Sequence, residues 1–463
     1  MLSVKRNLDD PMKKQGTVHS KGRSLTLSIS LLAVCGGVTL SAVPSRAEDL
    51  QEAYRQAAAA SPVIAQAKAE LDADLAGRPL ARSALLPHIN AGASGGMNTA
   101  YVTGFGAQSL STGYHSDVFR ASLTESIFNG QDFIAIKQAE SRIRAGEAAL
   151  AFAEQMVALE VAQSYFGVLR AQANERVTQQ QMDLLQRIAD QTNATLKVGT
   201  GDIISVQEVQ AQLDAARADL IAAKNAVEVA KNQLERLTHQ PVETLQDITT
   251  LQATGPQPDT IGPWLTVALT NQPLLQQAQE TLNVSQQQVE FAKRVRWPTL
   301  TLNGIGQHAA GTLIPPVAID QIGASFSLSI PIYEGGSTRA GIHQAEALAR
   351  ANKASLANLQ DQIKLDTQTA FLDLQNSVAQ FEAAQQSVTS AQVSLAGTQK
   401  GYEIGSRSII DLLTATTSYA VAQRNYYLAL YTQLVARTQL KAAAGVLTPL
   451  HIEAINNLLH GNP

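Results

Sequence analysis

The chain has 463 residues, enough for two or three ordinary globular domains, but its composition argues against ordinary globular packing. Aromatic residues make up only 5 % of the chain, whereas a compact domain of this length usually carries more Phe and Trp in its core. The formal net charge of −4 argues against a nucleic-acid partner. We therefore expect long helices, rich in Ala and Gln, that pack in thin layers.

Residues 1–47 have the parts of an export signal peptide. A basic region that contains Lys13 and Lys14 precedes an apolar run from Leu25 to Leu40, and Ser45-Arg46-Ala47 forms a small-x-small cleavage site. This segment carries seven of the 35 Lys and Arg residues and two of the 39 Asp and Glu residues, so the remaining chain has a net charge of −9. We expect an acidic, exported mature protein.

Two features of this segment leave alternatives open. Translation could start at Met12, because residues 1–11 add nothing to the signal. The only cysteine, Cys35, lies inside the apolar run, where a lipid-anchor cysteine would follow a small residue and not the bulky Val34. We expect Cys35 to be removed with the signal peptide, which leaves the mature chain without a thiol or a disulfide.

The first structural repeat is predicted over residues 48–239. Helical spacing with interruptions at 61–62 and 77–79 ends before Pro87, because the residue before a proline avoids the α region. Apolar and polar residues then alternate on both sides of a Gly- and Ser-rich loop, which predicts a β-hairpin over 88–128. A pattern without strong helix breakers from Gln131 to about Lys197 predicts a helix about 100 Å long.

An elbow at 198–205 separates this helix from a second one with two apolar stripes. The first stripe keeps heptad spacing and predicts a left-handed coiled coil. It consists of Val206, Val209, Leu213, Ala216, Leu220, Ala223, Val227, Ala230, Leu234 and Leu237. The second stripe consists of Ala211, Ala215, Ala218, Ala222, Asn225, Val229 and Asn232. Two stripes on one helix indicate neighbours on two sides, as in a closed wall of helices.

The second half of the chain repeats the first. Trp297-Pro298 matches Leu86-Pro87 at an offset of 211 residues, and an elbow at 402–411 matches the elbow at 198–205. We predict a connector at 240–263 that forms an equatorial region. A second repeat at 264–445 with a hairpin at 299–333 follows, and a short tail occupies 446–463. Residues Ile322 to Ile330 show the clearest alternation and predict a half-buried strand.

Each elbow has a glycine, Gly199 or Gly405, where a helix would end with a left-handed residue. Ser408 and Asp411 have the spacing of a capping box, and Ser205 is the first-repeat counterpart of Asp411. Four strands per chain cannot close a barrel, and open strand edges are not tolerated in a bilayer. We therefore expect several chains to share one barrel, and three chains would supply 12 strands. A small soluble sandwich is the alternative.

These features together resemble the TolC family of outer-membrane efflux and secretion channels. The resemblance rests on the opening Glu48-Asp49-Leu50, the strand 326–333, and above all the elbow from Gly401 to Leu413. It implies an α+β membrane protein: a trimeric 12-stranded transmembrane β-barrel continued by a periplasmic barrel of coiled-coil helices. It also implies a passive exit duct, not an enzyme, that works with a periplasmic adaptor and an inner-membrane ABC or proton-driven transporter. A periplasmic coiled-coil scaffold or adaptor without a channel is the competing class.

The resemblance also implies roles for elbow residues. Asp411 would line the periplasmic constriction of the pore, although it could also serve only as a helix cap. Thr414 stands where the family often has a second aspartate, which predicts a weaker acidic ring. Tyr402 and Arg407 match positions that hold the end shut as a gate latch, and the alternative for Arg407 is a solvated loop cation. Phe128, Trp297 and Tyr333 lie near the predicted membrane rims and could form an aromatic belt. We expect contact with outer-membrane lipid, and no metal or cofactor.

Overall fold

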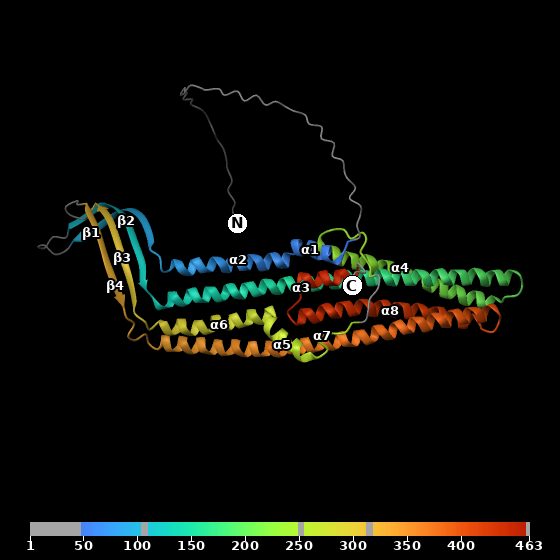
Figure 1. The fold of residues 1–463 in the computed structure, drawn as a ribbon. Helices are drawn as coiled ribbons and strands as arrows, with labels where there is room; N and C mark the ends of the chain where they lie inside the picture. Colours follow the sequence, from blue (N-terminus) through green and yellow to red (C-terminus); the bar gives the residue numbers. More distant parts are fainter. Residues whose placement is uncertain (1–47, 103–109, 249–253, 312–317, 460–463) are drawn as a thin grey trace, which may run out of the picture. The chain divides into compact units, whose positions relative to one another are not determined.

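The computed structural model describes residues 48–102, 110–248, 254–311 and 318–459. The predicted signal peptide at 1–47, with Met12 and Cys35, lies outside the described residues. The first half of the chain contains α1 (Leu50–Ala60), α2 (Pro62–Ser83), β1 (His88–Val102), β2 (Leu110–Phe128), α3 (Gly130–Lys197) and α4 (Ile203–Thr238), as Figure 1 shows.

The second half repeats this order of two short helices, two strands and two long helices. It contains α5 (Ile261–Asn271), α6 (Pro273–Arg294), β3 (Thr299–Ala310), β4 (Ile319–Ser329), α7 (Ser337–Glu403) and α8 (Ile409–Ala443). An additional helix, α9 (Pro449–Leu459), lies in the segment that we expected to be a short tail. The internal repeat that the sequence offsets predict is therefore present in the fold.

The long helices α3 and α7 are uninterrupted and have 68 and 67 residues. One part of α3 packs against α2 and α6, and another part packs against α4 and α8; α7 packs against α6 and α8. The interruption expected at 77–79 does not occur, and α2 continues through Pro79 to Ser83. A proline this close to the helix end removes a single intrahelical hydrogen bond, which packing against α3 offsets.

No helix among the described residues is sufficiently long and apolar to cross a bilayer.

The four strands form an antiparallel sheet in the order β1-β2-β3-β4. Cross-strand pairs such as Leu123 with Gly304 and Leu302 with Phe326 place residues of one kind on one face. That apolar face includes Ile89, Ala91, Ala121, Leu123, Leu300, Leu302, Ile322, Ala324, Phe326 and Leu328. The opposite face carries Ser, Thr and Asn residues, together with Arg120 bonded to Gln307. The predicted alternation is therefore present.

The expectation that Ile322 to Ile330 is half-buried is wrong for the single chain. β4 is exposed along its whole length, and Ile322 is 94 % exposed. The reason is that β4 is an edge strand and its apolar face packs against no second layer formed by the described residues. An exposed apolar face of this extent needs another surface to cover it.

Candidate functional site

The two elbows are built alike. Gly199 and Gly405 have φ angles of 79° and 75°, as their predicted left-handed positions require. After Gly199, the backbone amides of the next two residues donate to the carbonyl of Thr195. After Gly405, the next two amides donate in the same way to the carbonyl of Gly401. Each long helix therefore ends in a tight, hydrogen-bonded turn that directs the chain into the next helix.

Each elbow also presents one exposed carboxylate at the start of its second helix. The Ser408 Oγ accepts from the Asp411 backbone N–H at 3.1 Å, and the Ser408 N–H donates to Asp411 Oδ2 at 3.0 Å. In the first elbow the residue types are exchanged: Asp202 Oδ1 accepts from the Ser205 N–H at 2.8 Å. Asp202 was missed because the comparison of the two elbows matched Asp411 with Ser205. Its position as the N-cap residue before Ile203 is the signal that could have identified it.

The caps keep both carboxylates ionised. The Ser408 backbone N–H lowers the pKa of Asp411, and the nearby Arg407 guanidinium contributes to the same shift. The hydrogen bond from the Ser205 hydroxyl is the largest cause that lowers the pKa of Asp202. Both side chains are fully exposed to solvent, so their charges are available to a passing ion.

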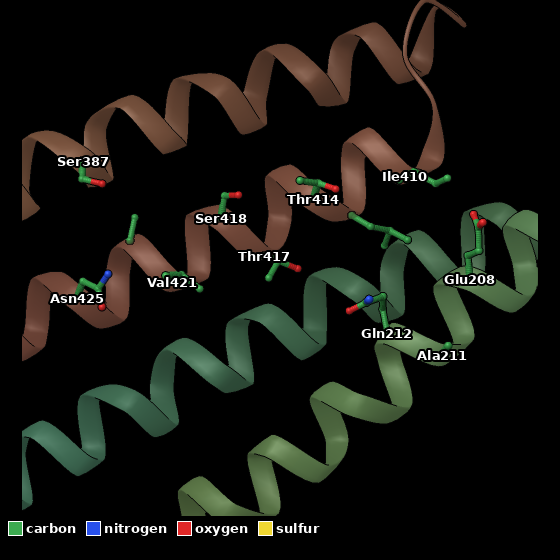
Figure 2. Close-up of a pocket in the computed structure, with 12 residues that line it drawn as sticks. Glu208, Ala211, Gln212, Ser387, Ile410, Thr414, Thr417, Ser418, Val421 and Asn425 are labelled. Carbon is green, nitrogen blue, oxygen red and sulfur yellow. The ribbon is translucent and has the colours of Figure 1, made fainter.

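An open groove with a volume of about 750 Å³ lies between α4 and α8 next to the elbows. Figure 2 shows Thr414 of α8 and Glu208 of α4 among the residues that line it. Asp411 does not line this groove, so the structure does not place Asp411 and Thr414 in one cavity. Glu208 was not among the residues predicted for the site. Ser205 and its counterpart Asp411 are 206 positions apart, and the same offset aligns Glu208 with Thr414.

The two residues of the expected latch lie in different surroundings. Tyr402 packs against an apolar elbow cluster made of Leu185, Ile188, Ala189, Val209, Leu213, Ala216, Ile409, Leu412 and Leu413. Arg407 is exposed, and its side chain leaves no room for a Cβ at Gly401, whose added Cβ would lie 2.7 Å from Arg407 Cγ. Within the described residues of this single chain, Tyr402 and Arg407 make no side-chain hydrogen bond or ion pair.

The residues of the expected aromatic belt are only partly brought together. The Phe128 and Trp297 rings are stacked with centroids 6.2 Å apart, whereas Tyr333 is exposed and pairs with no ring among the described residues. Across the part of the chain that the structure describes, no three His, Cys, Asp or Glu residues are grouped so that they could hold a metal ion.

The profile of the family described as "Outer membrane efflux protein" matches residues 53–239 and 264–446. Outer membrane protein TolC of Escherichia coli is 29 % identical over 93 % of this chain and 89 % of its own length. Alkaline protease secretion protein AprF of Pseudomonas aeruginosa is 26 % identical over 88 % of this chain and 86 % of its own length. The crystal structure of the Campylobacter jejuni CmeC outer membrane channel is similar with a TM-score of 0.76. It is 18 % identical and covers 89 % of this chain and 90 % of that one.

The shared fold is that of a trimeric channel in which each subunit supplies four strands to a 12-stranded transmembrane barrel. A barrel of long helices continues it into the periplasm. Because the matched family covers both repeats, the chain belongs to the outer membrane efflux protein family and is an exit duct of the outer membrane.

Proposed function

We propose that the elbow end of this exit duct is its periplasmic constriction, and that Asp411 contributes a ring of three carboxylates in the trimer. The observation that carries this proposal is the exposed position of Asp411, whose charge the Ser408 cap holds in place. A ring of like charges attracts cations and resists closure through mutual repulsion. Capping the helix and lining the pore are compatible, because the cap uses only Oδ2 of the carboxylate.

We propose that Glu208 supplies the second acidic position that Thr414 lacks. Glu208 and Thr414 both line the groove between α4 and α8, as Figure 2 shows. The constriction would then take its charge from both repeats instead of only from the second. Tyr402 and Arg407 remain the proposed latch, with partners on a neighbouring subunit.

We propose that the second apolar stripe of α4 is the seam against the neighbouring subunit. Its members from Ala211 to Asn232 are all exposed in the single chain, whereas Val209, Leu213, Ala216, Leu220, Ala223, Val227 and Leu234 of the first stripe are buried. A periplasmic adaptor and an inner-membrane ABC or proton-driven transporter would complete the assembly. The names of AprF and of the pyoverdine export protein OpmQ refer to protein secretion and to small-molecule export, so both cargo classes are compatible.

Single-channel recording of the purified trimer in planar bilayers tests the constriction. We expect Asp411→Asn and Glu208→Gln each to reduce the preference for K⁺ over Cl⁻, and the double variant to reduce it further. Asp366→Asn is the matched control, because it removes an exposed carboxylate from the middle of α7. Unchanged selectivity in the double variant would show that neither residue contributes charge to the pore. Intact conductance in the same recordings would show that the protein still forms a duct.

A further inference from the structure

A stack of basic and aromatic side chains lies where the strands of the sheet meet the helices. The Arg294 guanidinium lies over the Trp297 ring, 4.4 Å from its centroid. The other partner of Trp297 is Phe128, whose ring is almost parallel to it at an interplanar angle of 9°. We call Arg294, Trp297 and Phe128 the rim stack. Arg294 belongs to α6, Trp297 precedes β3, and Phe128 ends β2.

The rim stack belongs to the apolar face of the sheet. Strict alternation from Leu123 would place Phe128 on the polar face, but the register shifts between Ser126 and Phe128. This irregularity pairs Phe128 with Leu300, whose side chain lies on the apolar face. The shift therefore carries the aromatic ring, and Trp297 with it, to the side of the sheet that faces lipid in the barrel.

The position along the strands corresponds to one boundary of the bilayer. β3 begins at Thr299, and Leu300 and His308 are eight positions apart, about 26 Å along an extended strand and about 20 Å along the membrane normal at a tilt of about 40°. His308 contacts Asp320 at 2.6 Å and ends the apolar stretch at the far side. The rim stack lies at the near side, where the chain enters the helices, which in the barrel is the side of the periplasmic leaflet.

The start of α3 is shaped to accommodate the stack. A Cβ added to Gly130 would lie 3.0 Å from Trp297 Cε3 and 3.3 Å from Arg294 Cδ. Glycine at this position therefore lets the Trp297 ring and the stem of Arg294 lie directly against the helix. The fold therefore holds the side chains of the rim stack in place.

The positive charge at this rim is available. Lys293 pairs with Glu290 at 2.9 Å, but Arg294 and Arg296 have no salt bridge among the described residues. The carboxylate in the first turn of α3, Asp132, accepts from Ser126 and Asn129 instead. Two arginines next to Trp297 in the sequence, neither with a salt bridge in the part of the chain that the structure describes, favour an anionic occupant over a neutral one.

We propose that Arg294 and Arg296, with Trp297, bind the headgroup of an anionic phospholipid in the periplasmic leaflet of the outer membrane. The planar guanidinium donates two parallel hydrogen bonds to phosphate oxygens, and the indole sits at the glycerol level. A phosphatidylglycerol-type headgroup keeps a net negative charge, whereas a zwitterionic headgroup has none. This site would fix the position of the trimer in its membrane, which is a role separate from the conduction of substrates.

Fluorescence quenching measures the lipid next to Trp297 directly. The chain has only two tryptophans, so Trp264→Phe leaves Trp297 as the only reporter. The trimer is reconstituted into two equimolar vesicle preparations, one with brominated phosphatidylglycerol and plain phosphatidylcholine, and one with the labels exchanged. We expect the brominated anionic lipid to quench Trp297 at least about threefold more strongly than the brominated neutral lipid, because each basic residue near the surface attracts anionic lipid.

In the double variant Arg294→Gln with Arg296→Gln, the two brominated lipids should quench Trp297 equally. For the unmodified rim, about 0.5 M NaCl should reduce the difference between the two lipids without removing it. Arg217→Gln is the matched control, because it removes an exposed arginine of α4 near the elbow and should leave the preference unchanged. Equal quenching by both lipids in the unmodified rim, or a preference that persists in the double variant, would overturn the proposal. Conductance should remain intact in all three proteins, which separates this test from that of the duct.

Discussion

Removal of one hydroxyl group in the middle of the helical region should loosen a specific pair of backbone segments. The Tyr165 hydroxyl lies 3.0 Å from the carbonyl oxygen of Glu48 and 2.8 Å from that of Gln246. Those segments also bond directly, since the Glu48 N–H donates to Thr244 and the Gln246 N–H donates to Glu48. Tyr165 therefore joins the segment at Glu48, the segment at Gln246 and α3.

The size of the effect follows from burial. Tyr165 is 0 % exposed, and burial raises the pKa of its phenol, so the hydroxyl remains a donor through the physiological range. Tyr165→Phe keeps the packing and deletes the donor, which costs about 1–2 kcal/mol for a buried hydrogen bond. Opening of the two segments should then become about 5–30 times more frequent.

Hydrogen–deuterium exchange of the intact trimer tests this prediction. The amides of Glu48 and Gln246 should exchange faster by that factor, while amides in the centre of α3 keep their rates. Tyr54→Phe is the matched control, because Tyr54 packs against the same cluster but its hydroxyl has no partner among the described residues. Equal exchange in Tyr165→Phe and the unmodified protein, or equal acceleration in both variants, would refute the reasoning.

Three further changes test the elbows and the first α4 stripe. Gly405→Ala forces a Cβ into a φ of 75° and should cost about 1–2 kcal/mol, seen as a lower Tm of the trimer, whereas Gly397→Ala inside α7 should not destabilise it. Leu213→Ala should cost about 2–5 kcal/mol in urea unfolding, because Leu213 is 1 % exposed. The pKa values of Asp202 and Asp411 are lowered in the folded state, so their caps stabilise above the unfolded value of 3.8 and are lost as the pH falls below it. The protection factors of the elbow amides, which are the intrinsic exchange rates at each pH divided by the observed rates, should fall below about pH 4, and this pH dependence should be lost in Asp202→Asn with Asp411→Asn.

The helices and elbows could be predicted because their signals are local. Heptad spacing identified the buried stripe of α4, and Gly199 and Gly405 marked the C-terminal ends of α3 and α7. The Ser408 and Asp411 capping box was confirmed in both of its hydrogen bonds. The internal offset also contained the position of Glu208, but only a comparison of the two elbows residue by residue would have found it.

The ties in the middle of the helical region could not be predicted, because their partners are far apart in the sequence. The Leu50 N–H donates to Asn456 of α9, across 406 positions, and Tyr431 donates to Asp247 across 184 positions. No short-range pattern encodes such contacts. The segment predicted only as a short tail contains a helix, α9, whose buried Asn456 accepts from the N–H at the start of α1.

The hydrogen bonds between the two repeats are concentrated away from the elbows, and this distribution indicates where the duct can move. Arg176 of α3 pairs with Asp247 at 2.9 Å, and Tyr431 of α8 donates to the same carboxylate at 2.7 Å.

Between Arg176 and the elbows, no hydrogen bond or ion pair of the described residues joins α3 or α4 to α7 or α8. Apolar contacts of the elbow cluster join them there instead, beside the open groove that contains Glu208 and Thr414. Apolar contacts are non-directional and can slide, whereas the hydrogen bond from the partly buried Tyr431 hydroxyl has a preferred direction and length. Opening should therefore begin as a displacement of α7 and α8 against α3 and α4 at the elbow end, with the tyrosine and aspartate ties as the fixed point.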